Sequence, residues 1–600
     1  MPQVDNNRLH NGFKASLVKI LTLFGLLAAL PLLTACQTFL AGNAPQSGDA
    51  LPEKAPIQED LAETPPAPKL GDKTAGRIFQ HYLSATLAEN RGDIEAAGQH
   101  YLRAMRADED NTYLQDRAFA LLLAAGNYMD AVEVAKVITS NQASTQPLVQ
   151  MLLTFDDAIT GKHEKAMVRL SDMRRNAPNL IQFELIEQYI RLAGGEDPET
   201  IAQDLKTFDV GAGMIVYKYH HLGRLHLRAG NREAALEALR SGQLVDPNAL
   251  FIVTALGDVL MAEGRHDEAE TLFEAFLNLN PDSLLIHAAL KEAMEEKPVT
   301  LPEQTIEDDL AEVMFGLASL MIGQEVNITV RQFLHLALMA RSEHQMARFM
   351  LGLVEEQDGN HQRALVSYKK IKPGSAPHLS AQVRMAEVLF KTGQREQAIS
   401  HMQELVRDNP DVPRLHQSLA RLHQDMQHYK KAARHYTELI KTIDDPRRRH
   451  APLYFARGAA YERLQEFSKA ARDLEMSLKL EPNNPVVLNY LGYMWLDQGK
   501  NLDSAYDHIR QAAHLRPHDG AIVDSLGWVY YKKGQFETAI RYLEKAVSLL
   551  PNDPVINMHL GDAYNKTGRD EEARVKWQRA LNLNPENPAH VERLQNLLGE

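Results

Sequence analysis

Residues 520–551 read GAIVDSLGWVYYKKGQFETAIRYLEKAVSLLP, and the spacing of their small, large and turn-forming residues returns 34 positions further along the chain. In both copies a Leu-Gly pair is followed by tyrosine, then by glycine, two alanines and a proline. The first copy has Leu526, Gly527, Tyr530, Gly534, Ala539, Ala546 and Pro551, and the second has Leu560, Gly561, Tyr564, Gly568, Ala573, Ala580 and Pro585. A period of this length is typical of a repeat that contains two α-helices.

Each place in the pattern has a steric reason. Two helices that pack closely need a small residue where their backbones approach, and Gly527, Gly561 and Ala539 fill such places. Pro551 ends the second helix because proline cannot continue a helix. The pattern therefore predicts helix hairpins that stack on one another.

The same register can be followed through most of the chain after residue 75. Clear copies start at 216, 250, 345, 379, 413, 451, 485, 520 and 554, and weaker copies start near 78, 112 and 147. The segments 181–215 and 309–344 have helical apolar periodicity but few small residues at the expected places. This pattern is identified as that of the tetratricopeptide repeats.

The resemblance implies an all-α fold, a tetratricopeptide superhelix (α-solenoid) of about 12 clear and about 2–3 degraded helix-hairpin repeats. Each repeat is expected to contact mainly its neighbours, so no single compact core is expected. The segment 297–308 carries two prolines and several acids where a second helix should stand. It is either an irregular connection or a hinge between two arms.

The expected organisation follows from these observations and from the N-terminal composition. The segments are a lipoprotein signal peptide (1–35), a lipidated cysteine with a disordered Pro-rich tether (36–74), degenerate repeats (75–215), regular repeats (216–296), the irregular break (297–308), the C-terminal repeat array (309–587) and a capping helix (588–600).

The N-terminus has the pattern of an export signal. Basic residues precede an apolar run at 20–31 that is too short for a confident membrane span, and Leu33-Thr34-Ala35-Cys36 follows. These four residues resemble the bacterial lipobox, in which the cysteine becomes the first residue and carries lipid, palmitate included. The alternative is an ordinary signal peptide with a coincidental cysteine, although Cys36 is the only cysteine of the chain. Because Gln37 is not aspartate, the resemblance favours the outer membrane, facing the periplasm.

We find no sequence motif of an enzyme. The chain lacks a phosphate-binding loop, a Gly-x-Ser-x-Gly elbow, a Cys-x-x-Cys pair and a His-Glu-x-x-His zinc helix. His220, His221 and His226 are the nearest approach to a metal cluster, but no carboxylate or thiol stands at ligand spacing, which favours a packing role. We therefore assign no catalytic residue, metal or cofactor, and the net charge of −14 argues against nucleic-acid binding.

A binding surface is instead expected on the concave face, which the first helix of each repeat lines by resemblance to the family. The places that face inward in the last repeats hold Phe455, Asn489, Tyr490, Tyr493, Trp528, Tyr531 and Lys532. Tyrosine and tryptophan dominate the hot spots of protein interfaces, so we expect an extended or helical segment of a partner to dock here. The alternative is that some of these aromatic residues pack in the core.

The lipobox, the tether and repeats such as LNYLGYMW (488–495) and DSLGW (524–528) resemble the large tetratricopeptide outer-membrane lipoproteins of Gram-negative bacteria. Among these, the chain is similar to lipoprotein adaptors of a periplasmic carboxy-terminal processing protease. The resemblance implies a scaffold that recruits this protease, its cell-wall hydrolase substrates, or both, with no small-molecule substrate. The alternative is an assembly factor for an outer-membrane secretion or polysaccharide-export complex. An enzyme remains possible only if 181–215 or 309–344 hides a site.

Overall fold

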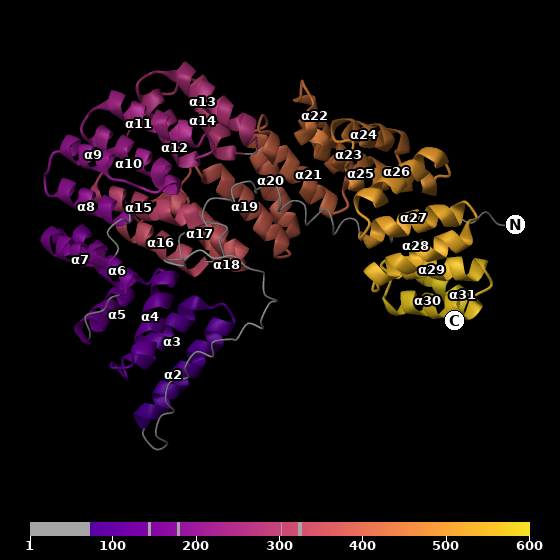
Figure 1. Ribbon diagram of the computed structural model, residues 1–600, viewed down its shortest axis with the longest axis horizontal. Helices are drawn as coiled ribbons and strands as arrows, with labels where there is room; N and C mark the ends of the chain where they lie inside the picture. The colour runs from indigo at the N-terminus through magenta and orange to yellow at the C-terminus, as the bar shows by residue number, and fades with distance from the viewer. Residues whose placement is uncertain are drawn as a thin grey trace, which may run out of the picture. The chain divides into compact units, whose positions relative to one another are not determined.

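The computed structural model describes residues 73–599, apart from 142–145, 177–180, 282, 302 and 322–326. These residues form α-helices and two short 3-10 helices, Ala212–Met214 and Arg448–His450, and the described part contains no β-strand (Figure 1). The predicted all-α fold is thus confirmed. The predicted signal peptide, Cys36 and nearly all of the tether lie outside the described residues. Within the described ranges, no helix combines the length and apolar character that a membrane span requires.

Contacts divide the chain into two compact units, Ala35–Arg414 and a second that contains Leu415–Glu600. The helices of the first unit are α2 (Lys73–Asn90), α3 (Ile94–Met105), α4 (Thr112–Ala125), α5 (Tyr128–Asn141), α6 (Pro147–Ile159), α7 (His163–Asn176), α8 (Ile181–Ala193), α9 (Pro198–Thr207), α10 (Ile215–Arg228), α11 (Arg232–Val245), α12 (Leu250–Ala262), α13 (His266–Leu279), α14 (Leu284–Met294), α15 (Ile306–Met321), α16 (Asn327–Ala340), α17 (Gln345–Gln357), α18 (His361–Lys369), α19 (His378–Lys391) and α20 (Arg395–Asp408). The remaining helices are α21 (Pro413–Asp425), which crosses the boundary, α22 (Tyr429–Lys441), α23 (Ala451–Arg463), α24 (Phe467–Leu480), α25 (Pro485–Asp497), α26 (Leu502–Leu515), α27 (Gly520–Lys532), α28 (Phe536–Leu549), α29 (Pro554–Lys566), α30 (Asp570–Asn582) and α31 (Pro588–Leu598).

The glycines of the repeat pattern lie where the two helices of a hairpin touch. A Cβ atom on Gly527 would lie 2.7 Å from Leu543 Cγ, and one on Gly561 would lie 2.5 Å from Trp577 Cδ1. Gly534, in the turn between α27 and α28, has a φ of 74°, which is the left-handed region that favours glycine. Both kinds of place therefore need glycine, one for space and the other for backbone conformation.

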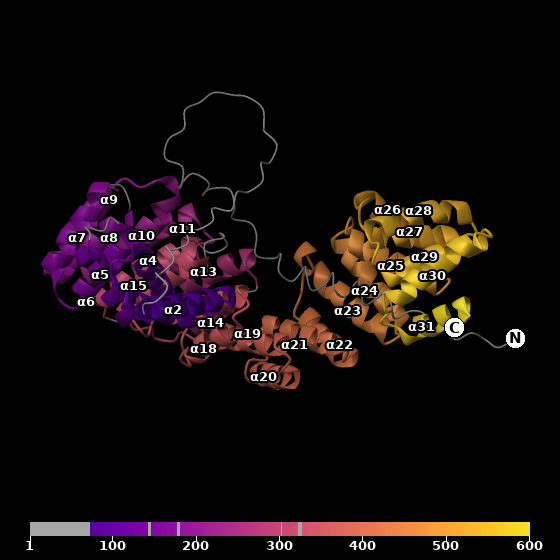
Figure 2. The same ribbon diagram turned by 90° about the horizontal axis from the view of Figure 1, so that it is seen from below.

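The first unit departs from a simple stack of hairpins. Helices α15 and α16 come after α14 in the chain, but α15 packs against α6 and α8, and α16 packs against α4 and α6 (Figures 1 and 2). Leu310, Val313, Met314 and Leu334 of these two helices are fully buried in one continuous hydrophobic core with α2–α10. The expectation that each repeat contacts mainly its neighbours is wrong here, because α15 and α16 fill the interior of the earlier repeats.

Polar contacts also hold this insertion. Arg224 Nη2 of α10 donates to Asp309 Oδ1 of α15 at 2.7 Å. Tyr217 Oη of α10 donates to the carbonyl oxygen of Val313 at 2.6 Å, and Gln332 Nε2 of α16 donates to that of Ala120 at 3.1 Å. The segment 309–344 thus lacks small residues at the expected places because its surface fits the inside of other hairpins.

The region between α14 and α15 is irregular in its described residues, since α14 ends at Met294 and α15 begins at Ile306. A hinge there stays a prediction. At the other end, α31 packs on α30, and Leu594 of α31 is fully buried. The last hairpin is therefore covered on its outer side.

Candidate functional site

The first helices of the last repeats start in the same way. Asn484, Asp519 and Asp553 stand directly before α25, α27 and α29, and each side chain accepts hydrogen bonds from two backbone N–H groups of the following helix at 2.8–3.3 Å. Such caps fix the first turn of each helix and hence the direction in which its later residues point. Helix α25 contacts α27 directly, and α27 contacts α29 directly, so the first helices of these repeats lie side by side on one face, which we call the inner face of this unit.

Three rings are stacked on this face. The Trp528 ring lies 4.4 Å from the Tyr531 ring with 5° between their planes, and 4.0 Å from the His559 ring with 15° between their planes. The ammonium of Lys532 lies 5.4 Å from the centre of the indole, where a cation is attracted to the ring. We call Tyr531, Trp528 and His559 the Trp528 stack.

A buried carboxylate, that of Asp524, contacts the His559 ring of the stack. Asp524 is fully buried, and both of its carboxylate oxygens lie 3.0 Å from Nδ1 of His559. Burial raises the pKa of Asp524, and the neighbouring His559 opposes this rise. The pair fixes the orientation of the imidazole, and the imidazole in turn supports the indole. His559 is not among the predicted groove residues, although it takes an inward-facing place of the repeat register.

A second group of aromatic residues lies in earlier repeats of the same unit, on α23 and α25. Tyr490 packs edge-on against Phe455, with ring centres 5.4 Å apart, and its Oη donates to Glu462 Oε2 at 3.1 Å. Burial raises the pKa of Tyr490 and of Tyr493 well above the usual value, and nearby carboxylates add to both shifts. These side chains are held among neighbours instead of standing free in a groove.

The predicted groove is therefore smaller than expected. Phe455 is 5% exposed and Asn489 is 2% exposed, so both belong to the core, which corrects their assignment to the surface. Phe455 is covered because the Tyr490 ring packs on it. Tyr490, Tyr493, Trp528 and Tyr531 are partly exposed, and Lys532 is exposed. The surface that a partner can reach centres on the Trp528 stack.

Charged groups border the stack on the side of the last helix. Arg593 Nη2 of α31 donates to Asp562 Oδ2 at 2.7 Å, and Trp577 Nε1 donates to Asp562 Oδ1 at 3.1 Å. Burial raises the pKa of Tyr531, and the carboxylate of Asp562 adds to this shift. An aromatic surface with charges at its edge is the composition of a protein-binding patch.

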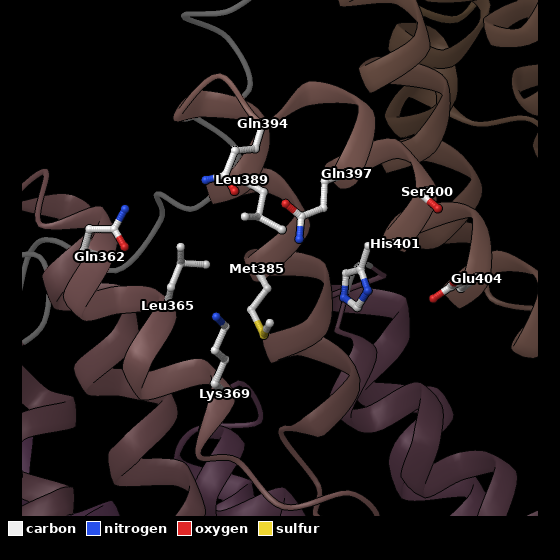
Figure 3. A pocket seen from close by; sticks show the side chains of 10 residues that line it. All are labelled: Gln362, Leu365, Lys369, Met385, Leu389, Gln394, Gln397, Ser400, His401 and Glu404. Atoms are coloured by element: carbon white, nitrogen blue, oxygen red, sulfur yellow. The ribbon is translucent and has the colours of Figure 1, made fainter.

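A separate pocket of about 380 Å³ lies in the first unit between α18 and α20, with α19 as its floor (Figure 3). Leu365, Met385 and Leu389 form the apolar floor, and polar side chains stand around it. The polar residues are Gln362, Lys369, Gln394, Gln397, Ser400, His401 and Glu404. The pocket was not predicted from the sequence, because most of its residues lie on the second helices α18 and α20, and the two on the first helix α19, Met385 and Leu389, take packing places of the repeat and not the inward-facing ones.

Two histidines of α10, His220 and His221, lie in the packed interior of the first unit, whereas the third, His226, is partly exposed, with its Nδ1 3.3 Å from Glu199 Oε2. His221 is fully buried and its Nδ1 lies 2.7 Å from Tyr189 Oη, while His220 Nε2 lies 3.7 Å from Glu312 Oε2. Burial lowers the pKa of His221 well below the usual value. Among the residues that the structure describes, no group of histidine, cysteine and acidic side chains is arranged to hold a metal ion.

Comparison with known proteins finds tetratricopeptide repeats in this chain. Models of the tetratricopeptide repeat match residues 221–283, 356–422, 451–484 and 530–598. The last range includes Tyr531 and His559 of the Trp528 stack, and Trp528 lies two residues before it. The chain is 25% identical over 532 residues to a TPR repeat-containing protein of Pseudomonas aeruginosa, covering 86% of this chain and 87% of that protein. Tetratricopeptide repeats act as protein-binding scaffolds.

Two solved structures are also similar. One is a tetratricopeptide repeat protein from Parabacteroides merdae, which is 15% identical in sequence and has a TM-score of 0.36. The alignment covers 43% of this chain and 99% of the Parabacteroides chain. The other is a chain of the APC/C hetero-tetramer Cut9-Hcn1, which is 13% identical in sequence and has a TM-score of 0.35. The alignment covers 88% of this chain and 96% of that chain.

Proposed function

We propose that this protein is a scaffold that is held on the outer membrane by lipid on Cys36 and binds protein partners in the periplasm. The observation that carries the proposal is the Trp528 stack. It presents partly exposed aromatic rings on the inner face of a repeat array, and the Asp524–His559 pair fixes them in place. Rigid aromatic side chains of this kind supply much of the binding energy of protein interfaces.

The partner that we propose is a periplasmic processing protease, together with the cell-wall hydrolases that it degrades. The support is the resemblance of the lipobox and the last repeats to lipoprotein adaptors of such a protease. A scaffold that holds an enzyme and its substrate on one array raises their effective concentration without taking part in the chemistry. This function needs no catalytic group in the chain itself.

The test removes the exposed rings and retains the fold. We expect the double variant Trp528→Ala, Tyr531→Ala to lower recovery of the partner from envelope extract by about tenfold or more, with unchanged helix content by circular dichroism. The matched control is Tyr506→Ala, Tyr542→Ala, because these two tyrosines pack on Tyr530 from the second helices α26 and α28. Equal recovery by both double variants would reject the Trp528 stack as the docking point.

The identity of the partner is tested separately with a photo-crosslinking amino acid in place of the exposed Lys532. Crosslinking in cells to a processing protease or a cell-wall hydrolase would support the adaptor role. Crosslinking to an outer-membrane secretion or export channel would instead support the assembly role. In the same cells, Cys36→Ser should move the protein from the membrane fraction to the soluble fraction.

A further inference from the structure

The pocket between α18 and α20 has a floor that is part of the hydrophobic core. Leu365 and Leu389 are 5% and 8% exposed and belong to a buried cluster of α18, α19 and α20, and Met385 packs against this cluster. Because these side chains hold one another in place, the floor is preformed. A concave site with an apolar floor and a few polar groups around it is the usual form of a small-ligand site. The volume of about 380 Å³ lies at the small end of the range for such sites.

Charged groups of opposite sign stand on the two walls of this pocket. Lys369 of α18 and Glu404 of α20 both line it. Within the ranges that the structure describes, neither side chain forms an ion pair or a hydrogen bond with another residue. Figure 3 shows the ammonium of Lys369 pointing over the floor beside Leu365, and Glu404 on the opposite side of the pocket, beyond His401. The pocket therefore offers a cation on one side and a carboxylate on the other.

Glutamine side chains border the same space. The carboxamide of Gln397 on α20 turns toward Met385 in the floor, and Gln362 stands on the wall that α18 forms (Figure 3). A carboxamide both donates and accepts hydrogen bonds, so it matches a peptide bond. A ligand that complements the whole set has a carboxylate at one end, an ammonium at the other, an amide between them and an apolar side chain. A nucleotide or another polyanion fits poorly, because part of its negative charge would lie close to Glu404.

We propose that this pocket binds a short zwitterionic peptide that carries an apolar side chain. The peptide carboxylate binds Lys369, its ammonium binds Glu404, its amide binds the carboxamide of Gln397, and its apolar side chain covers Met385. The volume leaves room for about two residues. The pocket belongs to the first unit, so peptide binding here does not depend on the docking of a partner at the Trp528 stack. The same chain thus has a site for peptides in addition to its surface for proteins.

The test measures binding of the dipeptide leucyl-leucine to the full-length chain by isothermal titration calorimetry. We expect Lys369→Gln and Glu404→Gln each to weaken binding by about fivefold, because each removes one charge pair near the surface. The matched controls are Lys370→Gln and Glu396→Gln. They remove charges of the same sign at the end of α18 and on α20, outside the pocket, and should leave the affinity unchanged.

Each part of the ligand has its own readout. N-acetyl-leucyl-leucine lacks the ammonium, so it should bind about fivefold more weakly, and Glu404→Gln should weaken it no further. Leucyl-leucine amide should behave in the same way toward Lys369→Gln. Glycyl-glycine keeps both charges but has no apolar side chain, so it should bind at least about tenfold more weakly.

Two results would overturn the peptide site. One is the absence of saturable leucyl-leucine binding up to about 10 mM. The other is equal affinity of the pocket variants and the control variants. Equal affinity of the unaltered chain for leucyl-leucine and its acetylated form would overturn the contact between the ammonium and Glu404, and with it the zwitterionic ligand.

Discussion

The indole of Trp528 and the imidazole of His559 are stacked 4.0 Å apart, although they belong to the first helices of two different repeats. Asp524, one turn before Trp528 on α27, binds the same imidazole through its buried carboxylate. His559 of α29 thus receives one contact from each of two residues of α27. The exposed aromatic surface therefore depends on the angle between these two repeats.

Replacing His559 by alanine should loosen both repeats. The change removes the ring below Trp528 and leaves Asp524 buried without its partner, which costs about 2–4 kcal/mol. Hydrogen exchange of the full-length chain should show this loss as faster exchange in α27 and α29. The double variant Asp524→Asn, His559→Ala should lose less than the sum of the two single changes, because the pair acts as a unit. Simple additivity would show that the two residues are not coupled.

Gly316→Ala should destabilise the first unit. A Cβ atom at this position of α15 would lie 2.2 Å from Cε2 of Tyr217. The Tyr217 ring cannot move aside easily, since it is 1% exposed and its hydroxyl donates to the carbonyl oxygen of Val313. Overpacking of about 1–3 kcal/mol then exceeds the gain of about 1 kcal/mol from the better helix propensity of alanine. The matched control is Gly76→Ala in α2, where nothing lies within 4 Å, and its melting temperature should not fall.

Arg224→Met should release α15 from α10. The side chain of Asp309 is fully buried, so loss of the Arg224 guanidinium leaves its carboxylate with only the more distant Arg228, 3.8 Å from Oδ2, at a cost of up to about 3–5 kcal/mol. The expected result is faster hydrogen exchange in α15 of the full-length chain. Adding Asp309→Asn removes the buried charge and should recover much of the loss. If the double variant exchanges as fast as Arg224→Met alone, the buried charge is not the cause.

The stability of the first unit should fall as the medium becomes acidic. Burial lowers the pKa of His335 to about 3, with further contributions from Arg363, Arg331 and Arg348. The unfolded chain binds a proton at this histidine near pH 6.5, whereas the folded chain does not until about pH 3, so stability is lost as the pH falls between these values. From His335 alone we expect a loss of about 2 kcal/mol between pH 7.5 and pH 5.

His335→Gln should make unfolding less sensitive to pH over this range. Urea unfolding of the full-length chain at pH 7.5 and pH 5 would measure the difference, followed by a probe in α16. The variant loses the contact between His335 Nδ1 and Tyr128 Oη, which are 3.2 Å apart, so its stability at pH 7.5 should also be lower. An unchanged pH dependence would show that His335 is protonated in the folded chain.

The repeat period predicted the hairpins because every place in it reports a contact between near neighbours. Gly527 and Gly561 illustrate this, since each meets a large residue from the second helix of its own hairpin. Trp528 and Tyr531 could be placed on the inner face for the same reason. The burial of Phe455 could not be predicted, because it depends on how far the Tyr490 ring of the next repeat leans over it.

The packing of α15 and α16 against earlier helices could not be predicted from the 34-residue period. Arg224 and Asp309 are 85 positions apart, and a regular 34-residue register carries no information about contacts over that distance. The sequence showed only the loss of small residues in 309–344. The structure gives the reason, which is that this segment packs against the inside of earlier repeats.

The insertion of α15 and α16 fixes the number of repeats in the first unit. In an open array a hairpin can be gained or lost with little damage, since each one contacts only the next. Here α15 contacts α6, α8 and α10, which come much earlier in the chain. Deletion of one hairpin between α10 and α15 would shift the position of α15 by one repeat and separate Asp309 from Arg224. Duplication or loss of a repeat during evolution is thus restricted in this unit. The array that carries the Trp528 stack can gain or lose a repeat with less damage.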